Sequence, residues 1–236
     1  MRNRFVMNMM SKTNRVLSAI MIALFLFVMA PAALLTAKEN KHELFRRVED
    51  FSRFDINTFP AGWESRGGDG AKVYHVKSEG ETYLEARAED TAVTIAKRFV
   101  YDLEEYPFLS WQWRADELPR GGDERYKKSG DSGAGIYVIF SGLFPKNIKY
   151  VWSASLPVGT NTKSPYNSKT RIVVLRNQSS PLQTWISEKV NVYEDYKRLF
   201  GEEPEQVQAI GIMTDSDNTH TVSLAQYKRI VVSGIQ

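Results

Sequence analysis

A period of two in the placement of apolar residues is the strongest constraint on the fold of this 236-residue chain. Leu109, Trp111 and Trp113 alternate with polar residues, as in a strand with one buried face. Similar short stretches recur along the chain, separated by turn-forming residues, which predicts an all-β sandwich or barrel. The expected strands are 73–76, 83–88, 91–100, 109–114, 135–140, 150–154, 171–175, 183–187, 207–214 and 221–232.

One late segment has the signals of a helix instead. Asn191 is a good N-cap, and Glu194 follows three residues later as in a capping box. Gly201 can adopt the left-handed conformation that ends a helix, and Pro204 lies just beyond it. The sequence therefore predicts one short helix that ends at about Phe200.

The N-terminus has the three parts of a secretory signal. Residues 1–15 are polar and basic, residues 16–29 are almost purely apolar, and small residues follow up to Ala37. We expect a signal helix that is cleaved after Ala33 or Ala37; a retained membrane anchor is the alternative. Both place the rest of the chain in the periplasm or outside the cell. The predicted organisation is a signal segment or anchor at 1–37, a charged linker at 38–47, and a β-sandwich domain at 48–236.

Charge and cysteine content exclude several classes of function. The formal net charge is +3, but residues 1–37 hold four basic and no acidic residues, which leaves −1 for the remainder. Nucleic-acid binding is not expected, because it needs a clustered basic face. The chain has no cysteine, which excludes disulfides, thiol catalysis and cysteine zinc sites. The only membrane contact predicted is the N-terminal segment, if it is retained.

Three stretches together resemble one exported bacterial family. They are Leu109–Glu124, then Asp131–Phe140 followed by Tyr150–Ser153, and Gly211–Thr219. These residues are similar to the family known as domain of unknown function 3047, over about residues 48–233. The string Thr-Asp-Ser-Asp-Asn-Thr in the third stretch is the most specific part of the resemblance. The family name implies no activity.

A broader resemblance concerns the first half of the domain. The order Glu49-Asp50-Phe51, Gly62-Trp63, paired strands and then Ser110–Trp113 is similar to galactose-binding-like jelly rolls, the architecture of many carbohydrate-binding modules. The resemblance implies a jelly-roll β-sandwich with a late helical turn. It also implies a structural Ca²⁺ that joins an acidic residue of the first strand, here Glu49 or Asp50, to a late Asp. The last expected strand, however, contains no Asp.

Acidic residues gather in two loops, 115–133 and 215–220. Their oxygens could bind Ca²⁺, which suits Asp215 and Asp217 as metal candidates, or two carboxylates could hydrolyse a glycosidic bond. The alternative is that these residues are turn formers that bond their own backbone. The sequence leaves open whether the two loops lie at the same end of the sandwich. The candidates for catalysis, if there is any, are Asp123, Glu124, Asp131, Asp215 and Asp217.

The aromatic residues fall into two groups. We expect Trp111 and Trp113 to lie in the core, because they alternate with polar residues. Trp63, Trp185 and Tyr166 stand in less periodic surroundings and are expected to be exposed, where an aromatic ring can stack on a sugar.

We therefore predict an exported, non-catalytic β-sandwich that binds a saccharide or cell-envelope glycan, with Ca²⁺ as a possible cofactor. The alternatives are a carboxylate-dependent enzyme acting on polysaccharide and a structural partner in an envelope complex. The residues expected to bind the ligand are Trp185, Tyr166, Arg114, Asp131, Asp215, Asp217 and Asn218.

Overall fold

The computed structural model describes residues 44–234, so the expected signal helix and most of the expected linker lie outside the described residues. Between these limits the chain forms thirteen strands, one α-helix and two short 3₁₀ turns. They are β1 Phe45–Glu49, β2 Glu64–Arg66, η1 Gly70–Lys72, β3 Tyr74–Glu79, β4 Glu81–Glu89, β5 Ala92–Tyr101, β6 Phe108–Glu117, η2 Lys127–Ser129, β7 Ala134–Phe140, β8 Asn147–Trp152, β9 Asn161–Lys163, β10 Thr170–Arg176, β11 Ile186–Asn191, α1 Val192–Phe200, β12 Val207–Asp215 and β13 Val222–Ser233.

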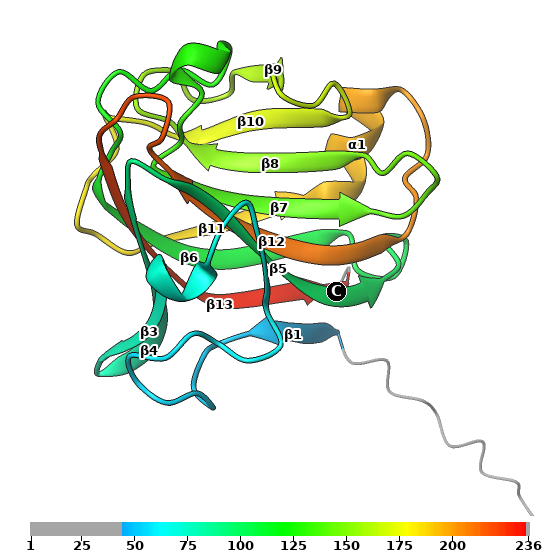
Figure 1. Cartoon of the computed structure of the whole chain (residues 1–236). Helices are drawn as coiled ribbons and strands as arrows, with labels where there is room; N and C mark the ends of the chain where they lie inside the picture. Colours follow the sequence, from blue (N-terminus) through cyan, green and yellow to red (C-terminus); the bar gives the residue numbers. More distant parts are fainter. Residues whose placement is uncertain (1–43, 235–236) are drawn as a thin grey trace, which may run out of the picture. The chain divides into compact units, whose positions relative to one another are not determined.

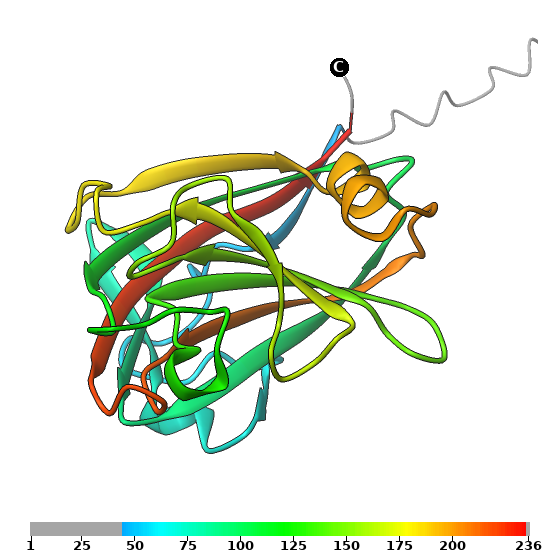
Figure 2. The same cartoon turned by 90° about the horizontal axis from the view of Figure 1, so that it is seen from above.

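The strands form two sheets that pack face to face (Figures 1 and 2). The first sheet has the order β11-β6-β13-β4-β3, with β1 also paired to β13, and the second has the order β2-β5-β12-β7-β8-β10-β9. Every pair is antiparallel except β8 and β10, which run in the same direction. The domain is thus the β-sandwich that the alternation predicts, with the jelly-roll architecture that the resemblance implies.

The core lies between the sheets and is rich in aromatic rings. Trp111 and Trp113 are 1% and 0% exposed, which confirms that their alternation marks a buried face. Their ring centroids lie 5.3 Å apart at an interplanar angle of 90°, and Trp113 also packs on Trp152 at 5.8 Å. Tilted and edge-to-face contacts of this kind are the favoured geometry of aromatic pairs.

The predicted helix is also confirmed. The Asn191 side chain accepts a hydrogen bond from the backbone N–H of Glu194 at 3.1 Å, and Gly201 follows Phe200 with φ of +74°. Val192 and Tyr196 face the core and are fully buried. Capping and amphipathicity are local properties, and so they could be read from the sequence.

Two sequence expectations need correction. The strand β1 begins at Phe45, within the expected linker, because Phe45 pairs with Ser233 at the edge of the first sheet. Trp63 was expected to be exposed but is only 4% exposed, since its ring stacks on Phe51 at 6.0 Å. The first error arises because the partner of Phe45 is distant in sequence, and the second because Trp63 and Phe51 lie outside any periodic segment.

The short strands β2 and β9 were not predicted, because three residues show no period. Within residues 44–234, no helix is long and apolar enough to cross a membrane.

Candidate ligand-binding site

The two acidic loops lie at the same end of the sandwich. The Asp131 carboxylate accepts hydrogen bonds from the backbone N–H groups of Asn218 at 3.2 Å and Thr219 at 2.8 Å, and from the Thr219 hydroxyl at 2.7 Å. The Asp215 carboxylate likewise accepts a hydrogen bond from the backbone N–H of Ser132 at 2.9 Å. These reciprocal bonds tie the start of β7 to the end of β12.

The path of the chain before β12 explains this meeting. The strand β11 does not end at Ser187 but continues to Asn191, which pairs with Phe108. It therefore carries the chain to the far end of the sandwich, where α1 lies, and β12 returns to the acidic loops (Figure 1). The sequence could not decide this, because it did not show how far β11 extends.

A cavity of about 250 Å³ opens beside the joined loops, on the outer face of the second sheet. Its floor is formed by Tyr137 of β7, Lys149 of β8 and Met213 of β12, whose neighbours along each strand face the core. The rim combines the β9–β10 turn with the β12–β13 turn. The remaining lining residues are Ala92, Gly130, Ser164, Pro165, Tyr166, Ile172, Asp215, Asp217 and Asn218.

Tyr166 joins the two sides of this rim. Its ring is 55% exposed, as expected, while its hydroxyl donates to the Lys127 carbonyl at 2.7 Å and also bonds the Asn218 side chain. The ring also lies against Gly130, since a Cβ added there would come within 2.8 Å of Tyr166 Cε2. Any larger residue at position 130 would displace the ring and narrow the cavity.

A buried lysine provides the positive charge of the cavity floor. Lys149 is 3% exposed; its ammonium donates to the Ser132 hydroxyl at 3.1 Å and lies 3.7 Å from the nearer Asp215 oxygen. Burial acts against the charged ammonium, but the charges of Asp215, Tyr137 and Glu124 together outweigh it, so the pKa of Lys149 is raised. Burial in turn raises the pKa of Asp215 from 3.8 to about 6, against the lowering effect of Lys149. At neutral pH the two groups form a buried ion pair.

Asp217 presents the carboxyl group nearest to solvent. It is half-buried at the cavity rim and contacts the Asp131 carboxylate behind it. Burial raises the pKa of Asp217, and the charge of Asp131 and the hydrogen bond to it raise the pKa further. Asp217 therefore holds its proton more tightly than a free Asp does.

The remaining catalytic candidates do not face the cavity. Asp123 forms a bidentate pair with Arg125, at 2.9 and 2.6 Å, on the surface of its loop. Glu124 is fully buried and accepts the Ser153 hydroxyl at 2.7 Å, and burial raises its pKa. Its second oxygen has no hydrogen-bond partner in the described structure. The five carboxylates thus do not form an open pair on either side of a substrate.

Two predicted ligand residues lie elsewhere. Arg114 and Trp185 are on the outer face of the first sheet, the opposite surface of the sandwich, where the guanidinium lies 5.4 Å from the Trp185 ring. The Lys228 ammonium approaches the same ring at 4.1 Å, and Tyr83 meets it edge-on at 5.6 Å. Trp185 is consequently half-buried by these neighbours. A single site cannot include Arg114 and Trp185 together with the predicted ligand residues at the cavity, because the two sets lie on opposite surfaces.

Basic side chains lie beside three of the four carboxylates suggested for Ca²⁺, which are Glu49, Asp50 and Asp215. The Lys97 ammonium lies 2.8 Å from the Glu49 carboxylate and 2.7 Å from the Val48 carbonyl, and Arg53 adds a second cation at 3.1 Å. Asp50 pairs with Arg47, and Asp215 faces Lys149. Among residues 44–234, no group of three or more His, Cys, Asp or Glu side chains is placed to hold a metal ion. These residues do not fit the calcium site that the resemblance implies.

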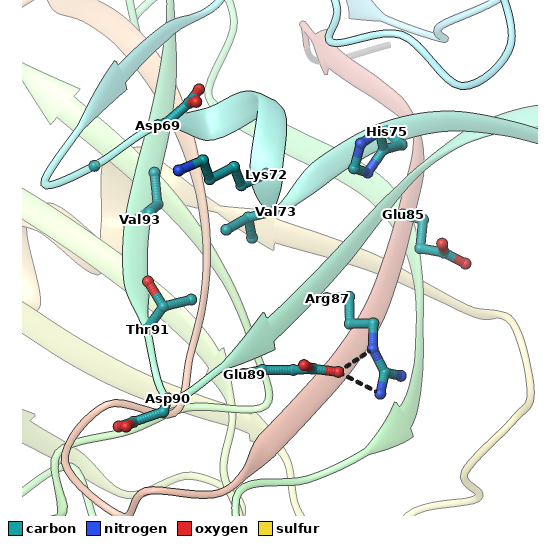
Figure 3. Close-up of a pocket in the computed structure, with 11 residues that line it drawn as sticks. Asp69, Lys72, Val73, His75, Glu85, Arg87, Glu89, Asp90, Thr91 and Val93 are labelled. Carbon is teal, nitrogen blue, oxygen red and sulfur yellow. Dashed lines mark hydrogen bonds and ion pairs between the residues drawn. The ribbon is translucent and has the colours of Figure 1, made fainter.

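A larger cavity, of about 660 Å³, lies beside the edge strand β3 and its neighbour β4 (Figure 3). Its walls are mostly charged, and Arg87 and Glu89 neutralise each other at 2.6 Å. Asp90 is held by His220 at 2.7 Å, and hydrogen bonding to Asp90 raises the pKa of His220. Its lining includes no Phe, Tyr or Trp and none of the predicted ligand residues.

Sequence reasoning missed the floor of the smaller cavity. A lysine inside the apolar run Ile148-Lys149-Tyr150-Val151-Trp152 was the available signal, because a charged residue in a central strand needs a partner. Tyr137 gave no such signal, since the strand around it is apolar on both faces.

The chain is a two-sheet β-sandwich with a cavity lined by aromatic and polar side chains. The chain belongs to the family described as protein of unknown function DUF3047, whose model matches residues 61–231. This confirms the resemblance carried by the three sequence stretches. A search of curated proteins finds no match.

Solved structures with a similar arrangement of strands include carbohydrate-binding modules. The family 11 module of the cellulase Lic26A-Cel5E of Clostridium thermocellum is 11% identical, with a TM-score of 0.44, and the match covers 81% of this chain and 95% of the module. The family 30 module of Cel9D-Cel44B from the same organism is 11% identical, with a TM-score of 0.41 and coverage of 75% and 94%. The K3 adhesin domain of Lys-gingipain from Porphyromonas gingivalis is 12% identical, with a TM-score of 0.38 and coverage of 80% and 100%.

Proposed function

We propose that this domain binds a saccharide, most plausibly a cell-envelope glycan, in the cavity between Tyr137 and Tyr166, without catalysis. The observation that carries the proposal is the composition of the cavity. An exposed Tyr ring at the rim and a second Tyr in the floor stand beside acidic, amide and ammonium groups. Sugars offer both apolar ring faces and many hydroxyls, so they need this mixture of aromatic and polar partners.

The size of the cavity favours a short glycan segment. At about 250 Å³ it lies just below the range that encloses drug-sized ligands. A pocket this small can hold one or two sugar rings, with the rest of a chain outside. The Tyr166 ring at the rim would then stack on the ring nearest to solvent, while Asp217 and Asn218 accept and donate hydrogen bonds to hydroxyls.

The arrangement of the carboxylates supports binding rather than hydrolysis. Glycosidases place two carboxyl groups on either side of the scissile bond. Here Asp217 alone stands at the rim, and Asp215 lies beneath it in an ion pair with Lys149. The oxygens of Asp131 already accept hydrogen bonds from the backbone N–H groups of Asn218 and Thr219.

A glycan-array screen followed by calorimetry on the best ligand tests the proposal. We expect Tyr166→Ala and Asp217→Asn each to weaken binding at least tenfold, because each removes a group at the cavity rim. Trp185→Ala is the matched control, since it removes an aromatic ring from the opposite face. No binding to any glycan would refute the proposal, and loss of binding only in Trp185→Ala would move the site to the first sheet.

The same assay separates the enzyme alternative. Released reducing ends would be measured over a day on every glycan that binds. We expect none, because no open carboxylate pair is assembled. Cleavage that Asp217→Asn abolishes would instead establish hydrolysis at this cavity.

We also propose that the domain works in the periplasm or outside the cell. The proposal rests on the basic and apolar composition of residues 1–37. Fusion of these residues to a reporter that is active only after export tests it, and Leu→Arg substitutions in the apolar stretch should abolish the signal. Mass spectrometry of the exported chain would show whether cleavage follows Ala33 or Ala37.

A further inference from the structure

The turn between β7 and β8 plays no part in the proposed glycan binding. Residues 141–146 lie at the end of the sandwich opposite the cavity, next to the start of β12, because Phe140 pairs with Val207 and Gly135 with Met213. In Figure 2 this turn stands out from the body of the sandwich. It carries the two most exposed large apolar side chains of residues 44–234, Leu143 at 88% and Phe144 at 71%.

Two residues and two backbone hydrogen bonds shape this turn. Gly142 has φ of +118°, a conformation open mainly to glycine, and Pro145 restricts the chain just after Phe144. At the base of the turn the Phe140 N–H bonds the Lys146 carbonyl at 3.1 Å, and the Ser141 N–H bonds the Gln206 carbonyl at 2.8 Å. Two adjacent, highly exposed large apolar side chains are a candidate contact surface.

Three cations lie near the turn on the side of β9 and β10. The Lys169 ammonium lies 5.9 Å from the centre of the Phe144 ring, and its charge helps to lower the pKa of Glu202. Arg171 donates to the backbone carbonyls of Ser168 at 2.9 Å and Leu199 at 3.3 Å, and Lys163 is its neighbour on the adjacent strand β9. In the part of the chain that the structure describes, Lys163 and Arg171 form no ion pair.

The one basic residue inside the turn is already neutralised. Lys146 forms an ion pair with Glu202 in the segment after α1. Acidic residues 102, 104 and 105 lie on the other side of this end, in the loop that follows β5. The surface that combines apolar and cationic groups is therefore the turn together with the β9–β10 edge, and we call it the apolar tip.

We propose that the apolar tip inserts into the interface of an anionic phospholipid bilayer, with Leu143 and Phe144 among the acyl chains and Lys163, Lys169 and Arg171 at the headgroups. Apolar side chains flanked by lysine and arginine are what such an interface binds, since the two kinds of contact add. A protein partner would need a wider apolar surface than two side chains.

The position of the domain's first strand agrees with this orientation. The chain enters the domain at Phe45, and the neighbouring Arg46 bonds the Val100 carbonyl at 3.2 Å, at the end of the sandwich that carries the tip. The part of the chain that precedes Phe45 therefore joins the domain at the end that carries the tip.

Depth measurements on vesicles test the proposal. The full chain contains no cysteine, so Leu143→Cys can be labelled uniquely with an environment-sensitive fluorophore and reconstituted with vesicles containing 30% phosphatidylglycerol, a composition of the order used to mimic bacterial membranes. We expect a blue shift and quenching by acyl-chain spin labels. Leu182→Cys, which is 40% exposed in the β10–β11 loop at the cavity end, is the matched control and should show neither.

Removing the charge of the lipid, or that of the protein, completes the test. In vesicles of neutral phosphatidylcholine the shift at position 143 should fall severalfold, and Lys163→Gln with Lys169→Gln should give the same loss in anionic vesicles. Lys127→Gln with Lys128→Gln, on η2 beside the cavity, should have no effect. A water-like signal at position 143, equal quenching at positions 143 and 182, or crosslinking of the tip to a protein while vesicles leave it unchanged would each overturn the proposal.

Discussion

Replacing Lys149 by Met should destabilise the domain in a strongly pH-dependent way. The substitution removes the ammonium that faces Asp215, while the unbranched apolar side chain of Met keeps most of the packing. In the intact protein, holding Asp215 ionised is already unfavourable: a pKa of about 6, against 3.8 for a free Asp, corresponds to about 3 kcal/mol. Without Lys149, the pKa of Asp215 must rise further.

The sign of the effect follows from proton binding. A carboxyl group whose pKa is raised in the folded state holds a proton that the unfolded chain has released, so stability falls as pH rises between the two pKa values. At pH 8, Asp215 of the variant must either ionise without a partner or take up a proton. We therefore expect Lys149→Met to lower the free energy of unfolding by about 3–5 kcal/mol at this pH. At pH 5 the folded state already holds the proton, and the loss should be much smaller.

Urea unfolding followed by tryptophan fluorescence at pH 5 and pH 8 measures both values. Adding Asp215→Asn to Lys149→Met should restore most of the stability at pH 8, because the amide oxygen can still accept the Ser132 N–H without a buried charge. Lys128→Met, on the exposed turn η2, is the control and should change stability by less than about 0.5 kcal/mol. An equal loss at both pH values, with no restoration by Asn, would refute the buried ion pair.

Three further predictions concern the fold. Trp113→Ala should cost about 3–5 kcal/mol, since the ring is fully buried between Trp111 and Trp152, whereas Trp185→Ala should cost clearly less; equal losses in chemical denaturation would contradict the assignment of core and surface. Asn191→Ala should lower stability by about 1 kcal/mol by removing the cap on the Glu194 N–H, and an unchanged unfolding midpoint would show that the cap is replaced by water. A chelator should leave the melting temperature of the intact protein unchanged, and Lys97→Met should lower it, because Glu49 then keeps only Arg53 as a cation; a lower melting temperature on chelation alone would restore the calcium site.

The sequence by itself determined the elements whose causes are local. Alternation placed Trp111 and Trp113 in the core, and Asn191 with Gly201 set both ends of α1. Strands of six or more residues were found because a period of two needs several repeats to be visible, and β2 and β9, with three residues each, were not.

Tertiary structure decided everything that depends on which strands are neighbours. The antiparallel pairing of β7 with β12, after β11 has carried the chain to the far end, brings Asp131 and Asp215 together. The pairing of β11 with β6 places Trp185 and Arg114 on the other sheet. Lys149 and Tyr137 became the floor of a cavity only because their strands lie side by side. The order of strands in a sheet is fixed by contacts between residues far apart in sequence, and a local pattern contains no record of them.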